Sequence, residues 1–110
     1  MKSYVGMEIL TMPRAIVLNR SDNVATLIDF GRAGESCALQ GEASGQVKLA
    51  QDIAFGHKVC IANIPQGANI LKYGQVIGRA SRTLKAGEHA HVHNVESARL
   101  SRDLAKAMSA

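Results

Sequence analysis

Glycine recurs at a regular spacing along the middle of this chain, and this spacing limits the fold more than any other feature. From residue 34 onward a glycine falls at every eleventh position. The series consists of Gly34, Gly45, Gly56, Gly67 and Gly78. Turn signals repeated about every 8–12 residues are typical of short strands in an all-β domain. The chain is therefore expected to form a small, mainly β domain with a turn near each of these glycines.

Three of the expected turns share a local pattern, in which an aliphatic residue stands three positions before the glycine. The segments are Ile53–Val59, Ile64–Ile70 and Leu84–Ala90. Glycine adopts backbone angles that are closed to residues with a Cβ, and the flanking aliphatic side chains would anchor each turn in the core. The eleven-residue segments differ in their other side chains, so no sequence duplication is inferred.

Short strands are expected between the turns, over about residues 59–62, 70–73, 76–80 and 90–94. Nearer the N-terminus, two apolar runs over residues 14–19 and 24–28 are separated by a polar segment. Short polar side chains hydrogen-bond to their own backbone, so this segment predicts a hairpin turn.

The two ends of the chain are interpreted separately from the β domain, which is placed at residues 13–96. Residues 1–12 are read as a flexible leader. Residues 97–110 are read as a C-terminal helical tail, because Leu100, Leu104 and Met108 are spaced as on one face of a short amphipathic helix.

Composition and charge exclude several classes of protein. A chain of 110 residues suits one domain. Its net charge of +4 is dispersed without a long basic run, and aromatic residues make up only 4%, so no nucleic-acid partner is expected. No apolar run approaches the ~20 residues of a membrane helix, and no signal peptide is recognised, so no membrane partner is expected.

Cys37 and Cys60 have apolar neighbours and lack the CxxC spacing of metal or redox pairs. Both are expected to be buried, reduced thiols, which is consistent with a cytoplasmic protein. A reactive thiol paired with His57 is the alternative.

Three of the four histidines lie close together at His89, His91 and His93. On an extended strand all three imidazoles would share one face. Imidazole binds Zn, Fe, Mn or Ni, so this strand is a candidate metal site. Residues four apart on a strand are separated by ~13 Å, so at most two neighbours could bind one ion. The alternative is a polar outer face on a half-buried strand.

Two further segments carry candidate functional side chains. His57 and Lys58 follow a glycine turn, where they could bind a carboxylate or transfer a proton if burial lowers the pKa of the lysine. A solvated turn is the alternative. Lys72 and Tyr73 would point to opposite faces of an extended segment, one toward the core and the other toward a ligand. The sequence contains no dinucleotide fingerprint, Walker, GxSxG or HExxH motif.

Four motifs occur in an order that resembles the small N-terminal domain of the altronate dehydratase (UxaA) family, an SAF domain. The motifs are Asp22–Ala25, Gly56–Val59, Lys72–Gly78 and Gly87–Asn94. The resemblance covers about residues 14–96, and His91-x-His93-Asn94 is the constant part of the last motif. It implies an SAF, or β-clip, fold of short, mostly antiparallel strands.

The resemblance also implies a function. Family enzymes are sugar-acid dehydratases and related lyases, including galactarate dehydratase and sulfolactate sulfo-lyase. In the dehydratases this domain precedes a larger catalytic domain, whereas in sulfolactate sulfo-lyase it is a separate small subunit. This chain is similar to the second arrangement. The resemblance implies a lyase subunit that is inactive without a separate large UxaA-type subunit.

The implied reaction is β-elimination of water or sulfite from a hydroxy or sugar acid, assisted by Fe, Mn or Mg. The alternative is a non-catalytic SAF module that recognises a sugar acid or another small anion. The sequence leaves open the substrate, the leaving group, the subunit that holds the metal, and whether the chain forms a homo-oligomer.

The resemblance implies roles for seven residues. His57 and Lys58 would bind a carboxylate or transfer a proton, and His91 and His93 would act in acid–base catalysis or bind the metal. Substrate contacts are expected from Lys72, Tyr73 and Asn94.

Overall fold

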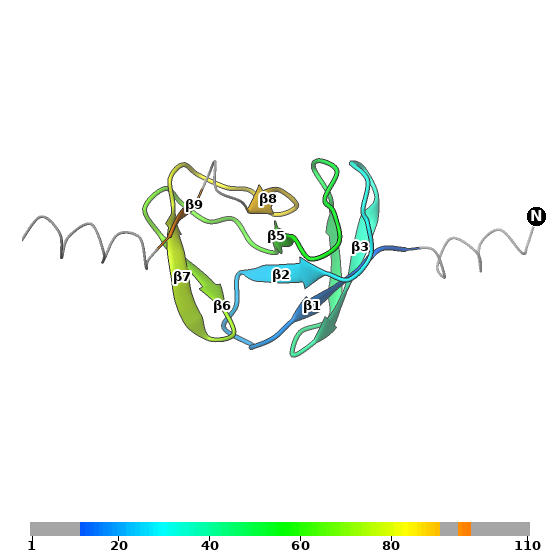
Figure 1. Cartoon of the computed structure of the whole chain (residues 1–110), viewed down its shortest axis with the longest axis horizontal. Helices are drawn as coiled ribbons and strands as arrows, with labels where there is room; N and C mark the ends of the chain where they lie inside the picture. The colour runs from blue at the N-terminus through cyan, green and yellow to red at the C-terminus, as the bar shows by residue number, and fades with distance from the viewer. Residues whose placement is uncertain (1–11, 91–94, 98–110) are drawn as a thin grey trace, which may run out of the picture.

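The computed structural model describes residues 12–90 and 95–97, and all of the regular secondary structure in this part is β (Figure 1). The strands are β1 (Arg14–Val17), β2 (Val24–Leu27), β3 (Ser36–Gly41), β4 (Gly45–Lys48), β5 (Lys58–Cys60), β6 (Asn69–Lys72), β7 (Gln75–Ala80), β8 (His89–Ala90) and β9 (Val95–Ser97). They form a six-stranded sheet in the order β4-β3-β1-β2-β5-β8 and a three-stranded sheet in the order β6-β7-β9. The prediction of a mainly β domain of short strands is confirmed.

The expected N-terminal hairpin is present, with β1 antiparallel to β2 and Ala15 opposite Leu27. The hairpin of β3 and β4 was not predicted as strands. Its residues are mostly exposed, and in the ladder only Cys37 and Val47 form a fully buried pair, so the apolar signal is weak. β3 also runs parallel to β1, which makes the large sheet mixed.

A central ribbon of β2, β5 and β8 separates two hydrophobic cores, and Figure 1 shows it between the β6–β7 hairpin and β3. Successive residues on a strand point to opposite faces. On β5, Val59 therefore belongs to one core and Cys60 to the other. On β2, Ala25 and Val24 divide in the same way. Because both faces of the ribbon are covered, these strands are apolar at consecutive positions rather than at alternate ones.

Four β-turns with the same hydrogen-bond pattern connect the strands. In each turn a glycine has a positive φ, and the next residue donates its N–H to the carbonyl of the residue two positions before the glycine. Each glycine N–H donates to the carbonyl of a buried residue in a strand or directly after one, and the N–H of that residue donates back to the residue after the glycine. The pairs are Gly34 with Leu49, Gly56 with Leu27, Gly67 with Ala80, and Gly87 with Cys60. Three of these four glycines belong to the regular spacing seen in the sequence.

The four turns form two equivalent pairs. Gly31 and Ile53 bridge the first pair, and Ile64 and Leu84 bridge the second. The β3–β4 hairpin corresponds to the β6–β7 hairpin, and the antiparallel pairing of β2 with β5 corresponds to that of β5 with β8. The backbone therefore repeats while the side chains differ, and β5 belongs to both repeats.

The glycine spacing misplaces one turn. Gly78 is buried inside β7, and the neighbouring chain reversal lies at Tyr73 and Gly74, both of which have positive φ. A glycine that lets two strands approach closely gives the same sequence signal as a turn glycine. The expectation of a turn at Gly78 is wrong for this reason.

Two predictions lie outside the described residues. These are the flexible leader, apart from its last residue, and the C-terminal helix expected after residue 97. The domain boundaries at residues 13 and 96 also stay predictions. No helix in the part of the chain that the structure describes is long and apolar enough to cross a membrane.

Replacing Gly87 with Ala should destabilise the domain far more than the same change at Gly34. Both glycines occupy the same turn position, with φ of +96° and +89°. A Cβ at Gly34 meets nothing nearby, so Gly34→Ala carries only the backbone strain of about 1–2 kcal/mol. A Cβ at Gly87 would collide with the carbonyl oxygen of Lys48, so its cost should exceed about 3 kcal/mol. Urea unfolding of both variants measures the difference, and equal losses would contradict this account of the turn.

Candidate functional site

His57 and Lys58 lie where the second turn enters β5, at the centre of the ribbon. Because they are consecutive, their side chains leave opposite faces. Lys58 lies opposite Thr26 on β2 and Ala90 on β8, so these three residues share one face. His57 is directed to the other face, where His89 lies. The two candidate residues of this motif therefore belong to two different surfaces.

Lys58 on β5 and Lys72 on β6 are near enough for the charge of one to act on the other. Both side chains are half-buried. Burial lowers the pKa of Lys58 from its ordinary value, and the positive charge of Lys72 lowers it further. Two lysine ammonium groups that repel each other in a half-buried place attract an anion, because a carboxylate between them would relieve the repulsion. The alternative of a solvated turn holds for Gly56 and His57, which are exposed, whereas Lys58 is half-buried.

Thr26 adds an unpartnered polar atom to the same face. Its Oγ1 is buried and has no hydrogen-bond partner among the described residues. An unsatisfied buried hydroxyl costs about 1–3 kcal/mol. Thr26 lies directly opposite Lys58 in the ladder. Sequence reasoning missed this residue, because threonine in a strand is ordinary and gives no functional signal.

A carboxylate that is distant in sequence holds the backbone next to Lys72. The buried side chain of Asp22 accepts hydrogen bonds from the backbone N–H groups of Asn19 at 3.0 Å and of Tyr73 and Gly74 at 2.8 Å. Asn23 Oδ1 accepts from the N–H of Leu71 at 2.7 Å. The Asp22-Asn23 motif is therefore structural: it holds the β6–β7 reversal in place.

Tyr73 lies in this reversal and not on an extended strand. Its φ is 58°, in the left-handed region that residues with a Cβ seldom adopt. β6 ends at Lys72, so the expectation of opposite strand faces does not apply here. The Tyr73 side chain is 68% exposed, next to the lysine pair in sequence. Its role in substrate contact stays a prediction.

His57 and His89 form a close pair. His57 Nδ1 and His89 Nε2 are 3.0 Å apart, and the ring centroids are 5.0 Å apart. The backbone N–H of His89 donates to Gln51 Oε1 at 3.1 Å. The sequence pattern grouped His89 with the next two histidines, whereas the structure pairs it with His57.

The other predicted site residues, His91, His93 and Asn94, lie outside the described residues. Their roles stay predictions. Within the described part of the chain, no group of three or more His, Cys, Asp or Glu side chains could hold a metal ion. A third protein ligand for a metal bound here would therefore have to come from outside the described residues.

The cysteines are free and buried, as expected. Burial, together with the negative charges of Asp29 and Glu35, raises the pKa of Cys37 to about 11. Burial and the charge of Glu88 raise the pKa of Cys60 to about 11. Both therefore stay protonated near neutral pH and are poor nucleophiles. The alternative of a reactive thiol is not supported.

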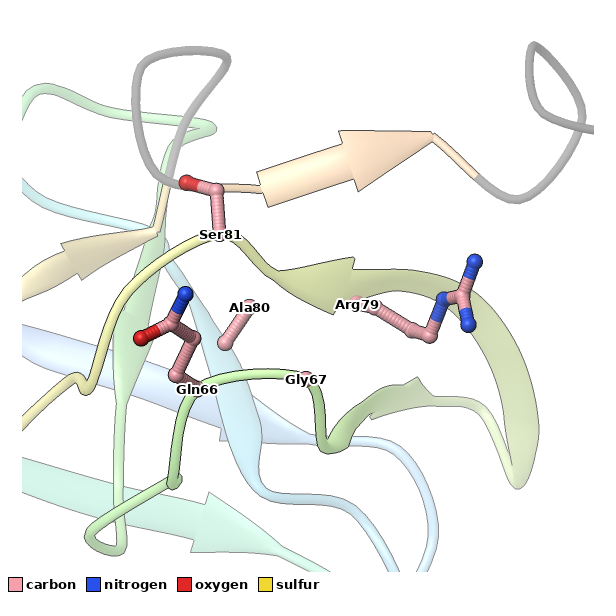
Figure 2. Close-up of a pocket in the computed structure, with 5 residues that line it drawn as sticks. All are labelled: Gln66, Gly67, Arg79, Ala80 and Ser81. Atoms are coloured by element: carbon pink, nitrogen blue, oxygen red, sulfur yellow. The ribbon is translucent and has the colours of Figure 1, made fainter.

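One hollow of about 250 Å³ lies on the surface beside the third turn, and none of the predicted site residues lines it. It is lined by Gln66, Gly67, Arg79, Ala80 and Ser81. Figure 2 shows the Arg79 guanidinium extending away from the Gln66 amide. The polar groups do not converge on one point, so the lysine pair is the stronger candidate site.

Two cores on a shared ribbon, with four turns built in the same way, define a small mainly β domain of the β-clip class. The sequence pattern of the altronate/galactarate dehydratase SAF domain matches residues 13–98. The chain belongs to this family.

Its relatives include both large and small proteins. The chain is 37% identical over 82 residues to altronate dehydratase of Escherichia coli strain K12, a match that covers 74% of this chain and 16% of that enzyme. It is 34% identical over 86 residues to altronate dehydratase of Bacillus subtilis strain 168, covering 78% of this chain and 17% of the enzyme. The chain thus spans about a sixth of these dehydratases.

A third relative is comparable in size to this chain. It is the (2R)-sulfolactate sulfo-lyase subunit alpha of Chromohalobacter salexigens, with 37% identity over 72 residues. The match covers 66% of this chain and 77% of that subunit.

Replacing Lys72 with Gln should raise the pKa of Lys58. The change removes the neighbouring positive charge but not the burial, which is the larger cause, so the pKa should stay below 10.5. Titration of the Lys58 Nζ resonance by NMR measures it. Lys48→Gln on the exposed side of β4 is the matched control and should leave the Lys58 resonance unchanged.

The lowered pKa of Lys58 also makes the free energy of unfolding depend on pH. Because the folded-state pKa of Lys58 is lowered, the unfolded chain binds more protons between that pKa and 10.5. The contribution of Lys58 to the free energy of unfolding therefore rises with pH across this window, and the rise should be smaller in Lys72→Gln. An unchanged Lys58 titration would contradict the proximity of the two lysines.

Proposed function

We propose that this chain is the SAF-domain small subunit of a UxaA-type carbon–oxygen or carbon–sulfur lyase. It acts with a separate large subunit on a hydroxy or sugar acid. The observation that carries the proposal is the pair of half-buried lysines, Lys58 and Lys72, beside the unpartnered hydroxyl of Thr26. This group can bind the carboxylate that such substrates have in common.

The lysine pair would act on the charge that develops during elimination. A base removes the proton α to the carboxylate, and negative charge then spreads onto the carboxylate oxygens. Cations already placed beside those oxygens stabilise the greater negative charge of the transition state more than the smaller charge of the bound substrate. Lys58 and Lys72 would hold the carboxylate, and the Thr26 hydroxyl would orient one of its oxygens. His91 and His93 are proposed for proton transfer, whereas His57 faces away from Lys58 and is not assigned to this step.

A divalent metal, Fe, Mn or Mg, is proposed for the assembled enzyme, where it would stabilise the same charge as a Lewis acid. Imidazole nitrogens on this chain fit a transition metal better than Mg, which prefers oxygen ligands. His91 and His93 were the ligands expected from the sequence.

The large subunit is proposed from the relatives. One is named as subunit alpha of a lyase, and this chain matches most of its length. In the altronate dehydratases the matched region is 16–17% of the protein, so the large subunit would supply what the remainder supplies there. We place the enzyme in the cytoplasm, where the two buried thiols stay reduced.

The proposal is tested by co-expressing the chain with a large subunit of the same family. The purified complex should eliminate water or sulfite from a hydroxy acid. Lys58→Gln and Lys72→Gln should each lower kcat/KM by about 10–100-fold, the effect of losing one charged hydrogen bond. Lys48→Gln, an exposed lysine on β4, should retain full activity.

Two outcomes would count against this function. If both variants form intact complexes with wild-type kcat/KM, the lysine pair takes no part in the reaction. Calorimetric binding of a sugar acid by the chain alone, with no turnover in any complex, would instead favour a non-catalytic binding module.

A further inference from the structure

The His57–His89 pair lies on the face of the ribbon opposite Lys58, and the carboxylate site does not use it. His57 ends the second turn and His89 begins β8, so they are 32 residues apart in sequence. Their ring nitrogens nevertheless lie 3.0 Å apart. We propose that His57 Nδ1 and His89 Nε2 together bind one divalent transition-metal ion.

The distance between the two nitrogens fits a shared ion. Metal–imidazole bonds are about 2.0–2.1 Å long, so two nitrogens on one ion lie about 3.0 Å apart at a right angle and about 3.4 Å apart at a tetrahedral angle. The pair therefore needs only a small rotation of the rings to chelate an ion. Without metal the same atoms form one hydrogen bond, in which one neutral ring donates and the other accepts.

The backbone of both histidines is held before any ion binds. The His57 carbonyl accepts from the N–H of Leu27 at 2.8 Å, and the His57 N–H donates to Ala54 at 3.1 Å. The His89 N–H donates to Gln51 Oε1 at 3.1 Å. Binding therefore costs little ordering of the main chain, which favours affinity.

The donor set selects the class of metal. Imidazole suits Fe, Ni, Cu and Zn, whereas Mg takes oxygen ligands. The described residues supply no third His, Cys, Asp or Glu to the pair, so it forms a half-site with open coordination positions. Open positions are what a metal needs to bind water or a substrate oxygen.

This inference goes beyond the proposed function, because the histidine pair lies on the face of the ribbon opposite Lys58 and is therefore a separate site from the carboxylate site. Lys58 projects from the opposite face of the ribbon, so its positive charge is directed away from the ion. The site can be tested on this chain alone, without measuring turnover.

The experiment isolates the pair by removing the other two histidines. The chain has four histidines, so the double variant His91→Ala/His93→Ala retains only His57 and His89. Titration of this full-length variant with NiCl2 at pH 7.5 by calorimetry should show one site, and MgCl2 should show none. Adding His57→Ala or His89→Ala should weaken Ni²⁺ binding at least tenfold.

Two controls keep the result interpretable. Substitution with Gln in place of Ala keeps a polar side chain at each position, and urea unfolding confirms that each variant is folded. Loss of Ni²⁺ binding in the double variant, or its persistence after removal of His57, overturns the proposal.

The outcomes separate this site from the proposed lyase. Ni²⁺ binding by the pair in a chain whose complexes have no lyase activity would keep the metal site and remove the proposed function. An active complex whose small subunit binds no Ni²⁺ through the pair would keep the proposed function and remove the metal site.

Discussion

The reciprocal hydrogen bonds between each glycine turn and a buried strand residue hold this domain together. Each turn gives one N–H to the strand and accepts one in return, so each turn is joined to the strand by a reciprocal pair of backbone hydrogen bonds. Two of these contacts define the ribbon, because they join Gly56 and His57 to Leu27, and Gly87 and Glu88 to Cys60. The entry points of β5 and β8, and hence every described candidate residue on them, depend on this pattern.

The candidate chemistry follows from the alternation of side chains along one short strand. Lys58 and His57 are neighbours in sequence, yet the ribbon directs one toward a lysine and the other toward a histidine. A carboxylate site and a metal half-site can therefore share the same strand without sharing a surface. Asp22 completes the arrangement, because it accepts two backbone hydrogen bonds from the reversal that follows Lys72 and a third from Asn19.

Much of the fold could be predicted from local signals, and the failures have physical causes. Glycine spacing located the turns at Gly34, Gly56 and Gly67, but it could not distinguish Gly78, which lies in a strand. Lys58 and Lys72 were identified as candidates from their motifs. Their proximity, and the pairing of His57 with His89, depends on the order of strands in the sheets, for which no local pattern exists.

The sharing of β5 by both repeats affects how the domain folds and unfolds. β5 closes the first repeat and opens the second, so neither half of the chain contains a complete set of strands. Cutting the chain within β5 would leave two fragments that each lack an edge of their core. The two cores are therefore expected to melt as one cooperative unit, and a ligand held on β5 is expected to slow hydrogen exchange on both sides of it.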